Sequence, residues 1–488
     1  MASDNITTPD YDIVIIGAGI SGINTAYRIQ TELPGKSYTI FEARDSLGGT
    51  WDLFKYPGIR SDSDLHTFGF AWRPWTSQSS IADGSSILRY LTDSVEETGI
   101  DKKIQYGQRV ESVDWSSQSA LWSVTIKPKG SDEPSRTIAC RWIVFGTGYY
   151  DYDTPLPAII PGIENFKGIV VHPQFWPTDL NYADKNIVII GSGATAITLL
   201  PSLAQKASHV TMLQRTPTYI LSLPAVDKLG NFIRKLFPSR VASYFVRLKF
   251  IVMSLLFFKC SKMFPSLSRR LLLGETKKQL PPSIPIDPHF NPPYNPWDQR
   301  LCTCPAGDFY KALSDGKGSV VTAHIDTVTE DGIRLKKNSE VLQPDIIVTA
   351  TGLKLRLIGG IQITIDNQPF DFSKQFVWRG ALLQNLPNAT FIIGYTNASW
   401  TLGADANATV MTRIIKNMDK KGAKVVIPST TEKMREKRLL NLNSTYIHHA
   451  DGMLPKTGDK GPWKPRDDYL VDVWKARFAS IESDLTYV

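Results

Sequence analysis

The sequence predicts an α/β fold with two domains, each built on a strand–turn–helix–strand unit. The second domain is predicted to be inserted in the first, and a helical insertion to follow. A β-branched run, a glycine-rich turn and a helix-compatible stretch occupy residues 11–30, and the same succession returns at 186–206. Residues 225–300 differ from both, being rich in Phe, Leu and Lys and then in Pro. At 488 residues the chain is too long for one hydrophobic core, so several domains are expected.

Two later turns indicate where the chain crosses between these domains. Residues 141–149 (RWIVFGTGY) are typical of a strand that ends at a glycine-rich turn, and residues 345–353 (DIIVTATGL) nearly repeat them. We therefore expect the first domain to be built from both ends of the chain. The predicted limits are 1–150 and 351–488 for the first domain, 151–224 and 301–350 for the second, and 225–300 for the insertion.

The first glycine-rich turn reads Gly17-x-Gly19-x-x-Gly22 and directly follows the strand 11–16. Glycines there permit a tight turn and the close approach of a pyrophosphate, which then lies at the positive end of the helix. Glu42 comes twenty residues after Gly22, at the end of the next strand, where a carboxylate can bind ribose hydroxyls. The unit is predicted to be a Rossmann-like dinucleotide site rather than an ordinary glycine turn.

The second turn reads Gly191-x-Gly193-x-x-Ala196, and the strand after it leads into Arg215-Thr216 without an acid. A carboxylate there would repel a 2′-phosphate, whereas Arg215 attracts one and Thr216 can donate a hydrogen bond to it. The second unit is therefore predicted to prefer NADPH to NADH. For Arg215 taken alone, a solvated arginine after a strand is the alternative.

Charge and cysteine usage exclude several classes of protein. The net charge of +8 is concentrated in residues 231–280, which hold 11 Lys/Arg and one acid, so a nucleic-acid role is not expected. Cys302 and Cys304 form no C-x-x-C pair and lie far from both glycine turns, which disfavours a flavin-dependent disulfide reductase. No metal-ligand spacing is apparent, and no metal is expected.

Targeting signals are not apparent in the sequence. The N-terminus has no basic n-region before its first strand, and the uncharged part of the basic segment, 250–258, is too short to span a bilayer. We expect a cytoplasmic protein.

Three stretches resemble signature sequences of the type I Baeyer–Villiger flavin monooxygenases. Residues 166–177 (FKGIVVHPQFWP) match F-x-G-x-x-x-H-x-x-x-W-P, and residues 48–62 (GGTWDLFKYPGIRSD) match G-G-x-W-x-x-x-x-[FY]-P-G-x-x-x-D. Residues 296–302 (PWDQRLC) resemble the segment that carries the family's active-site arginine. Within the family, YPGIRSDSD and GYTNASWTL resemble the ethionamide-activating monooxygenase subgroup, and the likeness covers nearly the whole chain.

The resemblance implies FAD in the first domain, NADPH in the second, and a C4a-peroxide of the reduced flavin that inserts oxygen beside a ketone carbonyl. Arg300 would be catalytic, since a permanently charged guanidinium stabilises both anions of that reaction, and Asp62 would orient it. Trp400 could help to cover the flavin.

The resemblance also implies the remaining site residues. The residues of the hinge between the two domains would couple the motion of one domain to that of the other rather than perform chemistry. The sets are Gly17, Gly19, Ser21, Gly22, Glu42, Trp51, Asp62 and the backbone near Val110 for FAD; Gly191, Ser192, Gly193, Ala194, Thr195, Ala196, Arg215 and Thr216 for NADPH; and Phe166, Gly168, His172, Trp176 and Pro177 for the hinge.

One departure and two alternatives stay open. Many relatives carry lysine just before the catalytic arginine, where this chain has Gln299, so NADPH preference would rest mainly on Arg215. The expected substrates are a small hydrophobic ketone and molecular oxygen. The alternatives are oxygenation of a sulfide or amine, and a non-catalytic flavoprotein that senses NADPH.

The basic segment allows two interpretations. An amphipathic helix could pack over the substrate site with its basic residues in water. Alternatively, residues 231–280 could attach weakly and reversibly to an anionic membrane surface.

Overall fold

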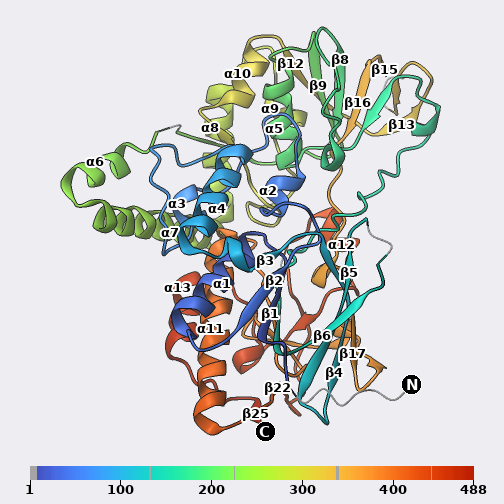
Figure 1. Ribbon diagram of the computed structural model, residues 1–488. Coiled ribbons are helices and arrows are strands. Elements are labelled where there is room, and N and C mark those ends of the chain that lie inside the picture. The colour runs from blue at the N-terminus through green and yellow to red at the C-terminus, as the bar shows by residue number, and fades with distance from the viewer. Residues whose placement is uncertain (1–7, 131–132, 225, 337–339, 441) are drawn as a thin grey trace.

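The computed structural model describes residues 8–130, 133–224, 226–336, 340–440 and 442–488. Within these residues the fold contains a nine-stranded sheet and a five-stranded parallel sheet, which lie at opposite ends of the molecule (Figure 1). The predicted α/β class with one domain inserted in the other is confirmed, because strands from both ends of the chain share the larger sheet.

The larger sheet combines early and late strands. Its parallel part arises from apolar, β-branched runs that are buried on both faces, as β1 illustrates with four fully buried residues in succession. The order is β18-β17-β4-β5-β6-β1-β2-β3, with β21 also paired to β6. These strands are β1 (Tyr11–Ile16), β2 (Tyr38–Phe41), β3 (Ile104–Gln105), β4 (Gln108–Ser116), β5 (Leu121–Pro128), β6 (Arg136–Phe145), β17 (Gln362–Ile365), β18 (Gln368–Pro369) and β21 (Ala389–Phe391).

The smaller sheet has the order β12-β9-β8-β16-β7 and is parallel throughout. The two strands of the second glycine-turn unit, predicted at 186–190 and 209–213, are observed as β8 and β9. The helix between them ends at Leu203 rather than near residue 206. The members are β7 (Ile169–Val171), β8 (Asn186–Ile190), β9 (His209–Gln214), β12 (Gly318–Thr322) and β16 (Ile346–Thr349).

The remaining elements surround the two sheets. The helices are α1 (Ile20–Glu32), α2 (Thr50–Leu53), α3 (Leu65–Phe68), α4 (Gly84–Thr98), α5 (Ala194–Leu203), α6 (Lys228–Leu236), α7 (Ser239–Met263), α8 (Pro265–Gln279), α9 (Ile286–His289), α10 (Asp308–Ser314), α11 (Trp400–Lys421), α12 (Thr445–His448) and α13 (Tyr469–Phe478). The short strands are β10 (Ile220–Leu223), β11 (Cys302–Pro305), β13 (Ile325–Val328), β14 (Ile333–Leu335), β15 (Val341–Leu342), β19 (Val377–Trp378), β20 (Leu382–Leu383), β22 (Val426–Pro428), β23 (Lys437–Arg438), β24 (Lys456–Thr457) and β25 (Leu485–Tyr487).

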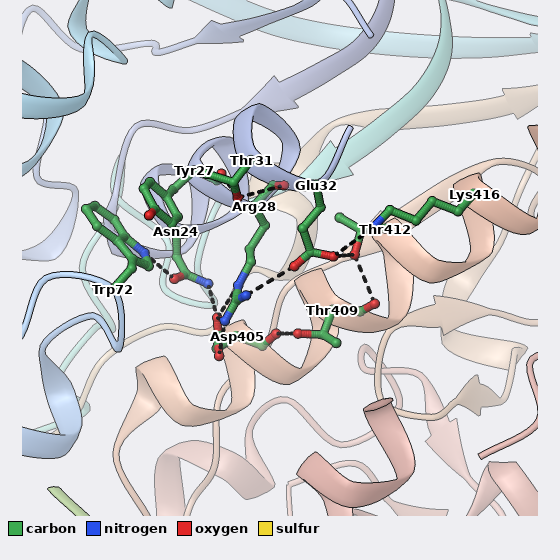
Figure 2. Close-up of polar contacts among 10 residues, drawn as sticks. All are labelled: Asn24, Tyr27, Arg28, Thr31, Glu32, Trp72, Asp405, Thr409, Thr412 and Lys416. Atoms are coloured by element: carbon green, nitrogen blue, oxygen red, sulfur yellow. Dashed lines mark hydrogen bonds and ion pairs between the residues drawn. The ribbon is translucent and has the colours of Figure 1, made fainter. Parts of the chain in front are cut away.

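A polar network joins α1 to α11, so that the first and last parts of the chain form one layer (Figure 2). Arg28 donates two hydrogen bonds of 2.9 Å to the buried carboxylate of Asp405. One turn further on, Glu32 accepts hydrogen bonds from Thr412 at 2.9 Å and from Lys416 at 3.3 Å. Removal of one partner would leave a charge poorly compensated, so this network specifies how the late helix docks.

The two crossing segments lie side by side, as their similar sequences indicate. Asp151 N–H donates to the carbonyl of Lys354 at 2.8 Å, and Tyr150 forms a β-bridge with Leu355. Lys354 Nζ lies 2.9 Å from the buried Asp151 carboxylate. The chain therefore leaves and re-enters the larger-sheet domain at one place.

The segment 225–300 differs from the expectation in two respects. The long helical stretch is divided into α6, α7 and α8, since Pro238 and Pro265 interrupt backbone hydrogen bonding at the two breaks. The second difference concerns length, which was judged from the nine uncharged residues 250–258 alone. By length and composition α7 is long and apolar enough to cross a bilayer, since its 25 residues include an 18-residue window of mean hydropathy 1.8, of which only 17% is buried. Two charges inside that window do not outweigh its apolar side chains.

Candidate functional site

The first glycine turn forms a cradle at the N-terminus of α1. A Cβ on Gly22 would lie 1.9 Å from the carbonyl oxygen of Gly17, so only glycine allows the helix to approach the strand this closely. Glu42 lies just after β2 and is buried; it accepts hydrogen bonds from the backbone N–H of Ala18 at 2.7 Å and of Arg44 at 3.0 Å. Burial raises the pKa of Glu42, which the bond from Ala18 partly offsets.

An aromatic stack lies beside this cradle. Trp400, the first residue of α11, donates its indole N–H to Ser21 Oγ at 2.8 Å. The ring of Tyr149 stacks on that of Trp400 with a centroid separation of 4.8 Å. The helix from the C-terminal part of the chain thus delivers an aromatic side chain to the first glycine turn, where a flat ring system could be covered.

Arg300 and Asp62 meet between the two domains, although 238 residues separate them in sequence. The guanidinium donates a hydrogen bond of 3.0 Å to the Asp62 carboxylate, and each side chain keeps about a third of its surface exposed (34% and 31%). The Asp62 charge raises the pKa of Arg300 further above its usual range. Arg300 therefore carries a positive charge at every physiological pH and still faces open space.

Three tyrosines surround this pair. Tyr149, Tyr150 and Tyr446 all interact electrostatically with Arg300, and the hydroxyls of Tyr149 and Tyr150 lie 2.6 Å apart. Burial raises the pKa of each phenol, so all three hydroxyls stay protonated near neutral pH and can donate hydrogen bonds.

The second glycine turn has the same backbone form as the first, but the next strand is followed by Arg215 instead of an acid. Ser192 Oγ donates to the carbonyl of Thr216 at 2.9 Å, which fixes the turn against the end of β9. Arg215 is exposed there and forms no ion pair with the residues that the structure describes. Cys302 Sγ, two residues after Arg300, lies 3.9 Å from the Ser192 carbonyl oxygen. The second turn and the Arg300 segment are therefore neighbours.

The predicted hinge residues lie on the smaller-sheet domain near the crossing. Phe166 and Trp176 are both buried, but in different apolar clusters. His172 Nδ1 accepts the backbone N–H of Gln174 at 3.2 Å, and Gln174 in turn donates to the carbonyl of Asp151 at 2.6 Å. Burial lowers the pKa of His172, so its ring is neutral and holds a short turn rather than a charge.

The other predicted residues fall around the two turns. Val110 is buried in β4, and Trp51 is half-buried with its ring edge-on to Phe68 at 5.5 Å between centroids. Thr195, in the first turn of α5, forms a side-chain hydrogen bond with the buried Tyr56. Gln299, half-buried, directly precedes Arg300.

The cysteines near the site are poorly suited to redox chemistry. Cys302 and Cys304 are buried in β11 and form no disulfide. Burial raises the pKa of both thiols to about 12, which leaves almost no thiolate at neutral pH. Among the described residues no group of three His, Cys, Asp or Glu side chains could hold a metal ion.

The tyrosines around Arg300 were missed by the sequence reasoning. Tyr149 and Tyr150 directly follow the predicted crossing turn, and that position could have marked them as interdomain residues. Tyr446 lies almost 150 residues beyond Arg300, and nothing local in the sequence distinguishes it.

Comparison with protein families gives two matches within the chain. Residues 74–259 match the flavin-binding monooxygenase-like family, and residues 15–78 match an NAD(P)-binding Rossmann-like domain.

Several relatives match nearly the whole chain. It is 43% identical over 479 residues to the FAD-containing monooxygenase EthA of Mycolicibacterium smegmatis, covering 98% of this chain and 96% of the relative. It is 44% identical over 464 residues to the probable FAD-binding monooxygenase AlmA of Acinetobacter baylyi, covering 94% and 92%. The putative FAD-containing monooxygenase MymA of Mycobacterium tuberculosis is 43% identical over 468 residues, covering 95% and 94%.

Solved structures share the fold at lower identity. An oxidized steroid monooxygenase bound to NADP superposes with a TM-score of 0.74 at 18% identity, covering 98% of this chain and 99% of that one. The polycyclic ketone monooxygenase of the fungus Thermothelomyces thermophila gives a TM-score of 0.76 at 16% identity, covering 98% and 89%. These likenesses concern the fold alone.

Proposed function

Because the chain belongs to the flavin-binding monooxygenase-like family, we propose that it is a Baeyer–Villiger monooxygenase that converts a hydrophobic ketone to an ester or lactone. The family makes it an FAD-dependent monooxygenase with an NAD(P)-binding domain. The Arg300–Asp62 pair is the observation that carries the finer assignment. The names of two structural neighbours, a steroid and a polycyclic ketone monooxygenase, agree with a ketone substrate.

The first glycine turn fits FAD. Gly19, the residue before α1, has no side chain that would keep a pyrophosphate from the helix N-terminus, and Gly22 lets the helix pack closely on the strand. The Glu42 carboxylate lies where ribose hydroxyls can donate to it. Ser21, Trp51, Val110 and the rest of the FAD set predicted from the sequence would complete that site, with Trp400 over the ring system. When bound and reduced by NADPH, the flavin supplies the activation of molecular oxygen.

Arg300 would stabilise the negative charge that develops on the former carbonyl oxygen of the ketone. Its guanidinium offers planar N–H donors, and Asp62 occupies only one side of it at 3.0 Å. Because the pair is one-third exposed, Arg300 can turn toward a substrate while Asp62 still limits its position. Asp62 is therefore a positioning residue for Arg300.

The three tyrosines would keep the reaction space dry and orient polar groups. Tyr149, Tyr150 and Tyr446 are half-buried residues that interact with Arg300, and they retain their protons, so they donate hydrogen bonds without acting as bases. A dry site lowers the local dielectric response and strengthens the effect of the guanidinium on a nearby anion.

The second turn would hold NADPH through its 2′-phosphate. Arg215 and Thr216 lie at the end of β9, and the residues 191–196 begin α5 beside them. The hinge set around His172, together with the domain limits at 150, 224, 300 and 350, would let one domain move against the other. This movement would bring nicotinamide and substrate in turn to one reaction space.

Product analysis tests the proposal. Purified protein with FAD, recycled NADPH and air would receive linear ketones, cyclic ketones and one thioether, and products would be identified by mass. Esters or lactones are expected, with a loss of about 100-fold or more in Arg300→Ala. Arg334→Ala, an exposed arginine on β14, is the matched control and should retain activity. Sulfoxide alone would assign heteroatom oxygenation instead, and NADPH use that yields only hydrogen peroxide and ignores Arg300→Ala would favour a sensor.

A further inference from the structure

The long helix α7 turns its apolar stripe outward. Exposed apolar side chains recur along it at spacings of three, four, five, three and seven residues, so they occupy one broad side of the helix. They are Val241, Tyr244, Leu248, Met253, Leu256 and Met263, and they are between 36% and 69% exposed. In contrast, only Ala242, Val246, Ile251 and Ser261 of this helix are buried.

The side of α7 that faces the rest of the protein makes the polar contacts. Arg247 donates to the carbonyl oxygens of His66 and Gly69, at 2.8 and 2.7 Å. Lys249 forms a largely buried ion pair with Asp227. The usual arrangement of a surface helix, apolar inside and polar outside, is therefore reversed in α7.

The neighbouring helices extend this apolar surface. Leu229, Phe232 and Leu236 of α6 are 55–60% exposed. An apolar groove lies between α6 and α7, lined by Ile233, Phe237, Phe245, Leu248, Lys249 and Val252. Figure 1 shows α6 and α7 projecting together from one side of the molecule. A contiguous patch of this kind is uncommon on a surface that meets only water.

Positive charge surrounds the patch. Lys235, Arg240, Arg270 and Lys277 are exposed, and none forms an ion pair with a described residue. Across 231–280 the single acid, Glu275, is bridged to Lys278. A second copy of the chain would bring a like charge of +10 against this surface, whereas an anionic lipid headgroup complements it.

We propose that α6 and α7, with the start of α8, form a docking surface for an anionic lipid bilayer. The helices lie in the interfacial plane with the outward apolar stripe among the acyl chains and the basic side chains at the headgroups. α7 does not cross the bilayer, because Arg247 ties its inner face to the backbone of His66 and Gly69. Lys249 ties the same helix to Asp227 at the start of α6.

The docking surface is connected to the reaction site. Ile251, on the inner face of α7, packs with Tyr395 and Leu402, which flank Trp400 in sequence. Bilayer attachment would therefore place the flavin-covering segment next to the membrane, where apolar substrates concentrate. The docking itself does not depend on which substrate the enzyme oxidises.

Vesicle co-sedimentation of the FAD-loaded protein tests the proposal. We expect binding to phosphatidylcholine vesicles that contain phosphatidylglycerol, little binding to phosphatidylcholine alone, and weaker binding at physiological than at low salt. The triple variant Lys235→Gln/Arg240→Gln/Arg270→Gln should lower the partition coefficient by about 5-fold per charge. Leu248→Glu/Leu256→Glu should abolish binding.

Matched controls separate docking from misfolding and from other occupants. Ile159→Glu changes a side chain that is 91% exposed but lies outside 226–280, and it should bind like the wild type. All variants should keep bound FAD and an unchanged melting temperature. No binding at low salt, or equal binding by Leu248→Glu/Leu256→Glu, would overturn the proposal. So would protein that resists a high-salt carbonate wash, which indicates spanning, or a vesicle-free dimer that the same double variant dissociates.

Discussion

The two glycine turns share a backbone plan but differ at the residue that directly follows the next strand. In the first turn that residue is Glu42, buried and held by the backbone of Ala18. In the second it is Arg215, exposed and unpaired among the described residues. The first turn is closed by Trp400 from a distant helix, whereas the second is fixed only by the local bond of Ser192 to Thr216. Under the proposed function, the first turn would therefore hold its nucleotide more firmly than the second.

The largest difference between the two turns is expected at the third position of the glycine motif, which is Gly22 in the first turn and Ala196 in the second. Gly22→Ala should abolish FAD binding, because the new Cβ would meet the Gly17 carbonyl, and backbone cannot swing aside. Overpacking of this kind costs about 1–3 kcal/mol or more. The equivalent residue of the second turn is already alanine, and Ala196→Gly should cost only about 1 kcal/mol. Flavin absorbance per protein and thermal melting measure both. Equal effects in the two turns would refute the difference.

The next largest effect is expected for substitution of Arg215, on the KM for NADPH. Arg215→Gln should raise the KM for NADPH by about 10-fold or more, with kcat and the KM for NADH little changed, because only the 2′-phosphate loses its partner. Steady-state kinetics with both cofactors measure this. Arg334→Gln is the control for loss of a surface charge. An equal rise in KM for NADH would show that Arg215 does not read the phosphate.

The buried acid of the first turn should show a pH signature. Burial raises the folded-state pKa of Glu42 above its unfolded value, so its protonated form stabilises the fold and this contribution is lost as pH rises through the folded pKa. When both are stripped of FAD, the melting temperature of Glu42→Gln should therefore rise relative to the wild type as pH increases from the unfolded-state pKa, about 4.3, through the folded-state pKa, and the gain should level off above it. The same variant should bind FAD more weakly. A melting difference that is independent of pH would contradict the assignment.

The smallest effect is expected at Gln299. Gln299→Lys places a lysine directly before Arg300 and should lower the KM for NADPH a few-fold through a second positive charge. The gain should be larger in Arg215→Gln than in the wild type, since the two charges serve one phosphate. NADPH titration of the four proteins measures this, and no gain in either background would place residue 299 away from the phosphate.

Local patterns predicted the two turns well because glycine spacing and strand ends are encoded within about thirty residues. The pairing of Asp62 with Arg300 came from resemblance, since no periodicity links residues so far apart. Tyr446 could not be found, because tertiary packing alone brings α12 to Arg300. The outward stripe of α7 was also beyond prediction: helical spacing shows which residues share a face, but not whether that face meets protein.

The shared sheet has a consequence for synthesis on the ribosome. Strands β4 and β6 receive β17 and β21, and α1 receives α11, from residues 362–421. The inserted parallel sheet is complete once β16 has emerged, so it can close while the N-terminal strands still have an unpaired edge. If translation ended before residue 421, the released chain would have a folded smaller-sheet domain and a larger sheet that lacks strands and exposes an unpaired, aggregation-prone edge. Chaperone demand should therefore peak late in translation.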